Sequence, residues 1–102
     1  MDKVERNGKI AVLISPGFGA GWITWNSEYP ECLFDPEIVE MVEKKEHDKI
    51  GDFARSKYGN DFYPGGGYQL QIVWLDKGTK FRVEEYDGSE SVTLVEDLTF
   101  EA

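Results

Sequence analysis

The chain has 102 residues, of which 20 are acidic and 11 basic, and its formal net charge is −9. This length fits a single domain, residues 1–102, and a composition that is 40% hydrophobic excludes a disordered tail. The surplus of acid argues against binding to duplex nucleic acid, which needs clustered lysine and arginine. We expect no membrane segment and no signal peptide, because no apolar run approaches about 20 residues and the start is charged.

The first third of the chain predicts a buried strand followed by a break. Lys9–Ser15 is short, apolar and rich in β-branched residues, as a buried strand is. The polar segment before it, Met1–Gly8, is expected to fray. Pro16–Gly21 carries three glycines and interrupts regular structure. Trp22–Trp25 suits a pleated surface and predicts a short second strand.

The middle of the chain predicts one or two helices. Asp35 suits a helix N-cap and Pro36 the first helical position, so a helix should begin there. A second helical stretch covers His47–Tyr58, and Gly59 is a natural C-terminal stop. The alternative is one kinked helix, because Gly51 is a weak point.

The last part of the chain predicts antiparallel strands joined by tight turns. Asp87-Gly88 is a strong hairpin signal, because glycine accepts the positive φ of a type I′ turn. The expected strands are Tyr68–Leu75, Thr79–Tyr86, Ser91–Val95 and an edge at Leu98–Phe100. The predicted fold class is therefore α+β, a mostly antiparallel β-sheet with one or two helices, roughly residues 36–58, packed on one face.

The glycine-aromatic segment is the first candidate site. The spacing G-x-G-x-G lets successive backbone N–H groups form a nest for an anion. It is no dinucleotide fingerprint, because Trp22 stands where a glycine is needed. Phe18, Trp22 and Trp25 offer flat faces on which a purine could stack. The alternative is that both tryptophans fill the core.

Two further features suit a phosphate group. The glycines of Pro64–Gly67, with Gly65 and Gly66 at the centre, form either a loop that closes over a phosphate or a linker. Arg82 stands mid-strand among acids, where it either holds a diphosphate with its bidentate fork or pairs with Glu84 or a cross-strand acid.

No catalytic constellation is recognisable. The acidic residues of the last hairpin alternate across a strand with no histidine nearby, so a solvated face is expected. His47 lacks zinc-site spacing, and Cys32 suits a small core hydrophobe. We therefore predict that the protein is not an enzyme and binds no cofactor and no metal ion. The acidic residues concerned are Glu84, Glu85, Asp87 and Glu90.

Two blocks of sequence carry a family resemblance: I-S-P-G-F-G-A-G-W-I-T-W, residues 14–25, and L-Q-I-V-W followed by F-R-V-E-E-Y-D-G-S-E, residues 70–74 and 81–90. The layout resembles small phage proteins, most of all the first family of Thoeris anti-defence proteins. Those proteins are sponges that bind cyclic ADP-ribose isomers without cleaving them, and some relatives hold cyclic oligonucleotides at a separate site. The resemblance implies an α+β fold, a homo-oligomer (a dimer or a hexamer of dimers) and a place in the host cytoplasm.

The resemblance also assigns roles to residues. Trp22 or Trp25 would stack on adenine, Arg82 would hold phosphate, and Gly65 and Gly66 would line the pocket. We therefore expect a non-enzymatic protein that sequesters a cyclic nucleotide signal. The alternative is an acidic inhibitor that binds a host defence protein through its negatively charged surface.

Overall fold

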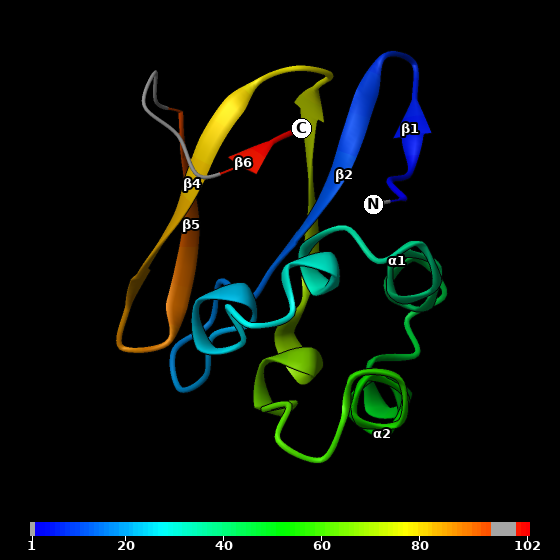
Figure 1. The fold of residues 1–102 in the computed structure, drawn as a ribbon, viewed down its shortest axis with the longest axis vertical. Coiled ribbons are helices and arrows are strands. Elements are labelled where there is room, and N and C mark those ends of the chain that lie inside the picture. The colour runs from blue at the N-terminus through cyan, green and yellow to red at the C-terminus, as the bar shows by residue number, and fades with distance from the viewer. Residues whose placement is uncertain (1, 95–99) are drawn as a thin grey trace.

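The computed structural model describes residues 2–94 and 100–102, which form two antiparallel sheets and two helices (Figure 1). The strand order is β1-β2-β3 in one sheet and β5-β4-β6 in the other. This arrangement confirms the predicted α+β class. The strands are β1 (Glu5–Arg6), β2 (Lys9–Ile14), β3 (Gln71–Asp76), β4 (Lys80–Tyr86), β5 (Ser89–Leu94) and β6 (Phe100–Glu101); the helices are α1 (Pro36–Glu43) and α2 (His47–Tyr58).

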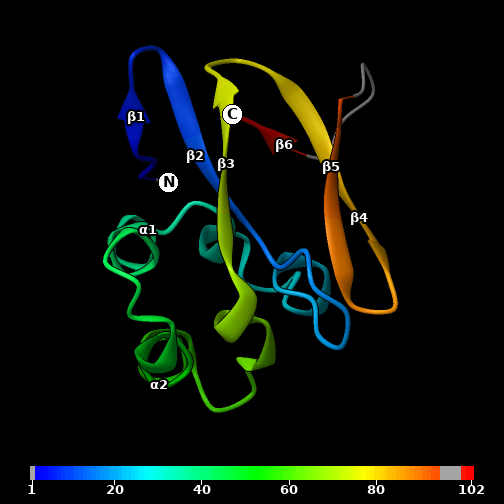
Figure 2. The same ribbon diagram turned by 180° about the vertical axis from the view of Figure 1, so that it is seen from behind.

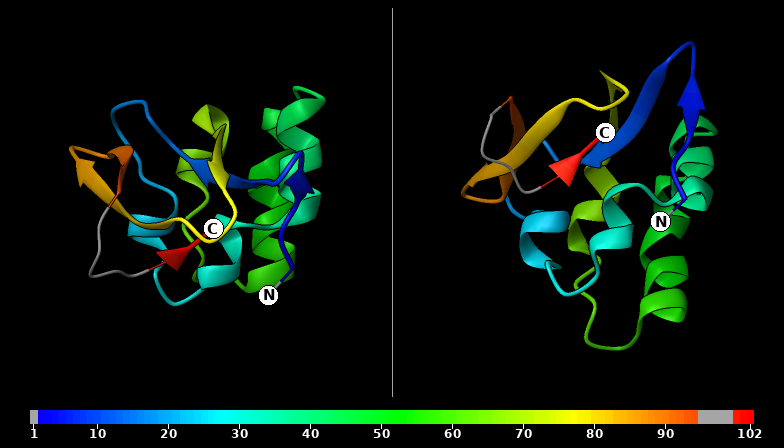
Figure 3. Two further views of the ribbon diagram at one scale, coloured as in Figure 1. Left: turned by 90° about the horizontal axis from the view of Figure 1, so that it is seen from above. Right: turned by 45° about the horizontal axis from the view of Figure 1, so that its top comes forward.

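Strand β2 lies at the centre of the fold, as its apolar sequence predicts. Every residue from Ile10 to Ile14 is buried, because β2 is paired on both edges and covered on both faces. Seen from above, the β4–β5 hairpin lies on one side of β2 and both helices lie on the other (Figure 3). The two sheets therefore share one core, which also takes in Trp22, Phe62 and Phe81.

The two helices begin and end where capping rules place them. The Asp35 carboxylate accepts hydrogen bonds from the backbone N–H groups of Glu37 and Ile38, at 2.9 and 3.3 Å. Helix α2 ends at Gly59, whose φ of 129° favours glycine. Lys45, at φ 59°, separates α1 from α2, so the chain forms two helices and not one kinked helix.

The β4–β5 hairpin has the type I′ turn that the sequence predicts at Asp87-Gly88. Asp87 and Gly88 have φ angles of 52° and 85°, the pair of positive values that a type I′ turn needs. Strand β3 begins at Gln71, three residues later than predicted, because Gly65–Gln69 form a 3₁₀ helix, η3. The predicted edge strand is present at Phe100, which pairs with Phe81 of β4. Leu98 of that strand, and Val95 at the end of the strand before it, lie outside the described residues.

Two local predictions were wrong. Trp22–Trp25 form no strand: Ile23–Trp25 are a 3₁₀ helix, η1, and Glu90 accepts the backbone N–H groups of Trp22 and Thr24 that a strand would offer to a neighbour. A third 3₁₀ helix, η2, covers Pro30–Leu33. Within the segment that was expected to fray, Glu5–Arg6 instead form strand β1, and Arg6 bonds the Glu43 carboxylate of α1 at 2.5 and 2.7 Å. Within the described residues, no helix has the length and apolar character needed to cross a membrane.

Candidate functional site

The three glycine-containing motifs meet at one junction, although they lie far apart in the sequence. The N–H of Gly19 donates to the carbonyl of Asp87 at 2.9 Å, and the Ser89 hydroxyl donates to the carbonyl of Pro16 at 2.5 Å. A Cβ added to Gly66 would stand 2.6 Å from the carbonyl oxygen of Gly21. We call this contact region the glycine junction; it consists of Pro16–Trp22, Gly65–Gln69 and Asp87–Glu90.

An internal carboxylate fills the anion nest at the junction. Glu90 is 2% exposed, and its carboxylate accepts hydrogen bonds from the N–H groups of Ser15, Trp22 and Thr24 at 2.7–2.9 Å. The Thr24 hydroxyl donates a fourth at 2.6 Å. The expectation that Glu90 is solvated is therefore wrong, whereas Glu84, Glu85 and Asp87 are exposed as expected. The N–H groups that hold Glu90 belong to Ser15, Trp22 and Thr24, and not to the successive residues of the G-x-G-x-G segment as predicted; the Gly19 N–H donates to Asp87 instead.

The three aromatic candidates separate into one core residue and two surface residues. Trp22 is fully buried, packs edge-on against Phe62, and donates its indole N–H to the carbonyl of Cys32 at 2.8 Å. It offers no face to a ligand, so we do not retain it as a stacking residue. Trp25 is 40% exposed and Phe18 is 67% exposed, and both remain candidates.

The glycines of Pro64–Gly67 do not form an open loop. Gly65 and Gly66 begin η3, and the N–H of Gly67 donates to the carbonyl of Pro64 at 2.9 Å. Gly66 is buried, and a Cβ on Gly65 would stand 2.7 Å from the ring of Tyr63. Gly66 therefore has a packing role behind the surface, whereas Gly65 is only partly buried, beside Tyr63.

Arg82 and Trp25 line two adjoining depressions. Arg82 shares a depression of about 220 Å³ with Thr24, Val83 and Ser27. Trp25 lines a second depression, of about 260 Å³, that also includes Ser27. Ser27 lines both depressions, so the two adjoin at this residue. Arg82 bonds Glu84 at 3.2 Å, and both side chains are half exposed.

The Trp25 depression contains residues that sequence reasoning missed. Tyr29 donates its hydroxyl to Asp61, and the Trp25 and Tyr63 ring centroids are 4.8 Å apart. The hydrogen bond to Asp61 raises the pKa of Tyr29 to about 12, and burial and the charges of Asp61 and Glu28 add to the shift. The mixed acidic and aromatic run at residues 60–63 is the signal that could have found this site.

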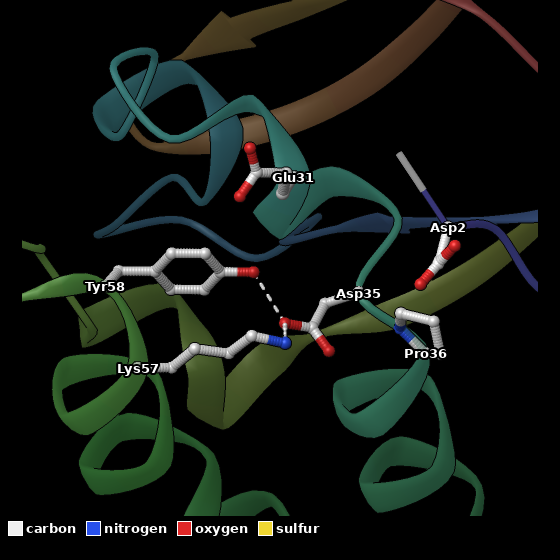
Figure 4. A pocket seen from close by; sticks show the side chains of 6 residues that line it. All are labelled: Asp2, Glu31, Asp35, Pro36, Lys57 and Tyr58. Atoms are coloured by element: carbon white, nitrogen blue, oxygen red, sulfur yellow. Dashed lines mark hydrogen bonds and ion pairs between the residues drawn. The ribbon is translucent and has the colours of Figure 1, made fainter.

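A third depression, of about 470 Å³, lies between α1 and α2 (Figure 4). At its centre the buried Asp35 carboxylate accepts from the Tyr58 hydroxyl at 2.5 Å and pairs with Lys57 at 2.9 Å. The pKa of Lys57 is raised by Asp35, and that of Tyr58 by burial and by the same carboxylate. The cluster joins the two helices, and the raised pKa values favour the protonated forms of Lys57 and Tyr58.

The remaining reactive side chains are also held in structural roles. Burial raises the pKa of the Cys32 thiol, which lies in the core. His47 bonds the carbonyl of Leu70 at 2.9 Å through Nε2. Among the described residues, no three histidine, cysteine or acidic side chains are placed to hold a metal ion. Comparisons with protein-family models, curated proteins and solved structures find no match for this chain.

Proposed function

We propose that this protein binds a cyclic nucleotide signal, such as a cyclic ADP-ribose isomer, and sequesters it without cleaving it. The base would stack on Trp25 and a phosphate would bind Arg82. The observation that carries the proposal is the shared residue Ser27, which joins the depression of Trp25 to that of Arg82. Phe18, exposed on the glycine junction, supplies a second stacking face.

The energetic terms favour such a ligand. Stacking on an aromatic side chain contributes roughly 1–3 kcal/mol per base. Arg82 would exchange Glu84 for a phosphate at small cost, because an exposed ion pair contributes about 0–1 kcal/mol. The net charge of −9 opposes an anionic ligand only weakly, since charges beyond a Debye length of about 8 Å are screened.

The proposal includes no chemical step. The residues that line the two adjoining depressions include no histidine, cysteine or lysine. The Tyr29 hydroxyl bonds Asp61, and its raised pKa disfavours the phenolate. Capture therefore depends on affinity and on protein concentration, as sequestration requires. The expected location is the host cytoplasm, where the signal is made.

The proposed sponge is a homo-oligomer, and the free edge of β3 is the place where a second copy would pair. Within the described residues β3 pairs with β2 alone, and from behind it runs in front of β2 (Figure 2). Gln71–Leu75 carry no charge, so a second copy could approach this edge without repulsion in a chain of net charge −9. Mass measurement by light scattering across a concentration series tests the oligomer directly.

A second candidate function is inhibition of a host protein through the acidic surface. Glu28 and Asp61 favour it, because neither forms an ion pair with another described residue. Ionic strength separates the two functions: charge-driven binding to a protein should weaken steeply with salt, whereas stacking should weaken little.

Calorimetric titration tests the proposed function. The chain is titrated with a glycocyclic ADP-ribose isomer and, in parallel, with cyclic di- and trinucleotides. We expect tight binding of one of them, and a loss of roughly tenfold or more in Trp25→Ala and in Arg82→Ala. Asp52→Asn, an exposed change on α2, is the matched control and should bind as the wild type does. Absence of heat with all these ligands would overturn the proposal.

A further inference from the structure

The depression beside Trp25 combines aromatic rings with acidic groups. Trp25 and Tyr29 line it together with Glu28 and Asp61, and Tyr63 packs against Trp25 with the two ring planes inclined by 58°. Its volume of about 260 Å³ is suited to one aromatic ring and its substituents. Both the acidic groups and the Trp25 face are accessible to solvent.

The acidic groups of this depression are not neutralised by the chain. In the described part of the chain, neither Glu28 nor Asp61 pairs with a lysine or arginine, although eight other ion pairs form. The Tyr29 hydroxyl donates to Asp61 and leaves its negative charge in place. The raised pKa of Tyr29 is consistent with a negative potential at the depression.

Such a combination discriminates between charged and neutral rings. The face of an indole attracts a cation more strongly than the faces of other aromatic side chains do, because its quadrupole is the largest. Two carboxylates at the rim add a Coulombic attraction of the same sign. A neutral ring at the same place gains stacking alone, and an anionic ring is repelled.

We infer that the depression beside Trp25 binds a planar, positively charged ring, such as an N-alkylated purine or pyridinium. The inference rests on the proposed function in placing a base against Trp25, and it adds the charge of that base. Arg82 lies in the adjoining depression. A nucleotide with a cationic ring and an anionic phosphate would therefore match the two depressions with opposite charges.

A pair of small molecules that differ by one charge tests the inference. The intact chain is titrated with 1-methylnicotinamide, a cation, and with nicotinamide, its neutral counterpart. The signal is the indole N–H resonance of Trp25 in ¹⁵N-labelled protein, assigned with Trp25→Phe. We expect the cation to bind at least about fivefold more tightly than the neutral ring. Equal affinities, or no shift of the Trp25 signal with either molecule, would overturn the inference.

Charge-removing variants make the test specific. Glu28→Gln with Asp61→Asn keeps an oxygen acceptor for Tyr29 and should reduce the preference for the cation to what the Trp25 ring alone provides. Asp52→Asn, which removes a charge elsewhere, should retain the preference, and spectra of both variants verify that they fold. A preference that is undiminished in Glu28→Gln/Asp61→Asn would contradict the inference.

The same probes keep the two proposals apart. Neither probe carries a phosphate, so Arg82→Ala should not weaken their binding. Binding of the cation without binding of any cyclic nucleotide would defeat the proposed function alone. Binding of a cyclic nucleotide without a preference for the cation would defeat this inference alone.

Discussion

Glu90 Oε2 accepts a hydrogen bond of 2.7 Å from the backbone N–H of Trp22, a residue 68 positions earlier in the chain. This bond ties the β4–β5 hairpin to the glycine-aromatic segment and turns Trp22 toward the core. Trp25, three residues later, is left at the surface. The position of the candidate site therefore depends on a buried carboxylate that takes no part in ligand binding.

Replacing this carboxylate should destabilise the whole fold. Glu90→Gln replaces one carboxylate oxygen by an NH₂ group, which cannot accept the hydrogen bonds that the backbone N–H groups and the Thr24 hydroxyl donate. The substitution also removes the negative charge that strengthens all four hydrogen bonds. We expect the free energy of unfolding to fall by roughly 3 kcal/mol, which urea denaturation would measure. A fall no larger than that of Asp52→Asn would contradict this role for Glu90.

Replacement by alanine should change the stability of the protein in opposite directions at two glycines, Gly66 and Gly51. A Cβ at Gly66 would stand 2.6 Å from the carbonyl oxygen of Gly21, so Gly66→Ala should open the glycine junction and destabilise the protein. Gly51 lies inside α2, where a Cβ would make an ordinary 3.4 Å contact with Pro64. Gly51→Ala should therefore stabilise the protein by about 0.5–1 kcal/mol. Thermal denaturation of both variants tests the pair, and the same sign in both would refute it.

Stability should fall at high pH because of Tyr58. Its folded-state pKa is raised above the ordinary value of 10.0 by burial and by the Asp35 carboxylate. Its contribution is complete below about pH 10 and is lost as the pH rises further, since the unfolded chain ionises first. Unfolding free energies measured between pH 8 and pH 11 should fall less steeply in Tyr58→Phe than in the wild type. Equal slopes would contradict the assignment.

Trp22 and Trp25 should have separable roles. Trp22→Ala removes a fully buried side chain and should cost about 3–5 kcal/mol of stability. Trp25→Ala should cost less stability, because Trp25 is 40% exposed, and should weaken ligand binding roughly tenfold or more. Urea denaturation and calorimetry on the same two variants check this. Loss of ligand binding in a well-folded Trp22→Phe variant, with binding retained in Trp25→Ala, would reverse the assignment.

Local signals in the sequence predicted most of the fold. Asp35 and Pro36 mark the start of α1, Gly59 marks the end of α2, and Asp87-Gly88 forms the predicted turn. These features depend on neighbouring residues and on backbone angles, which a sequence displays directly. Trp22–Trp25 were assigned wrongly because β-propensity is weak beside the three hydrogen bonds that this segment donates to one distant carboxylate.

The candidate site was predictable in part. The sequence indicated an anion nest, stacking rings and an arginine, and the structure brings Trp25 and Arg82 to adjoining depressions. It did not indicate that Glu90 fills the nest, because only the tertiary fold brings β5 to Ser15. Nor did it indicate Asp61, which lies 36 positions after Trp25 in the sequence, beyond the end of α2, and lines the same depression.

Recovery of intact ligand tests the central claim most directly. The protein is mixed with an equimolar cyclic ADP-ribose isomer, passed through a filter that retains protein, and then heated to release what it holds. The account predicts that the free ligand disappears from the filtrate and that the heated sample returns it chemically unchanged. Free ligand undiminished in the filtrate, or a cleaved product after heating, would contradict the claim that this protein sequesters a nucleotide signal.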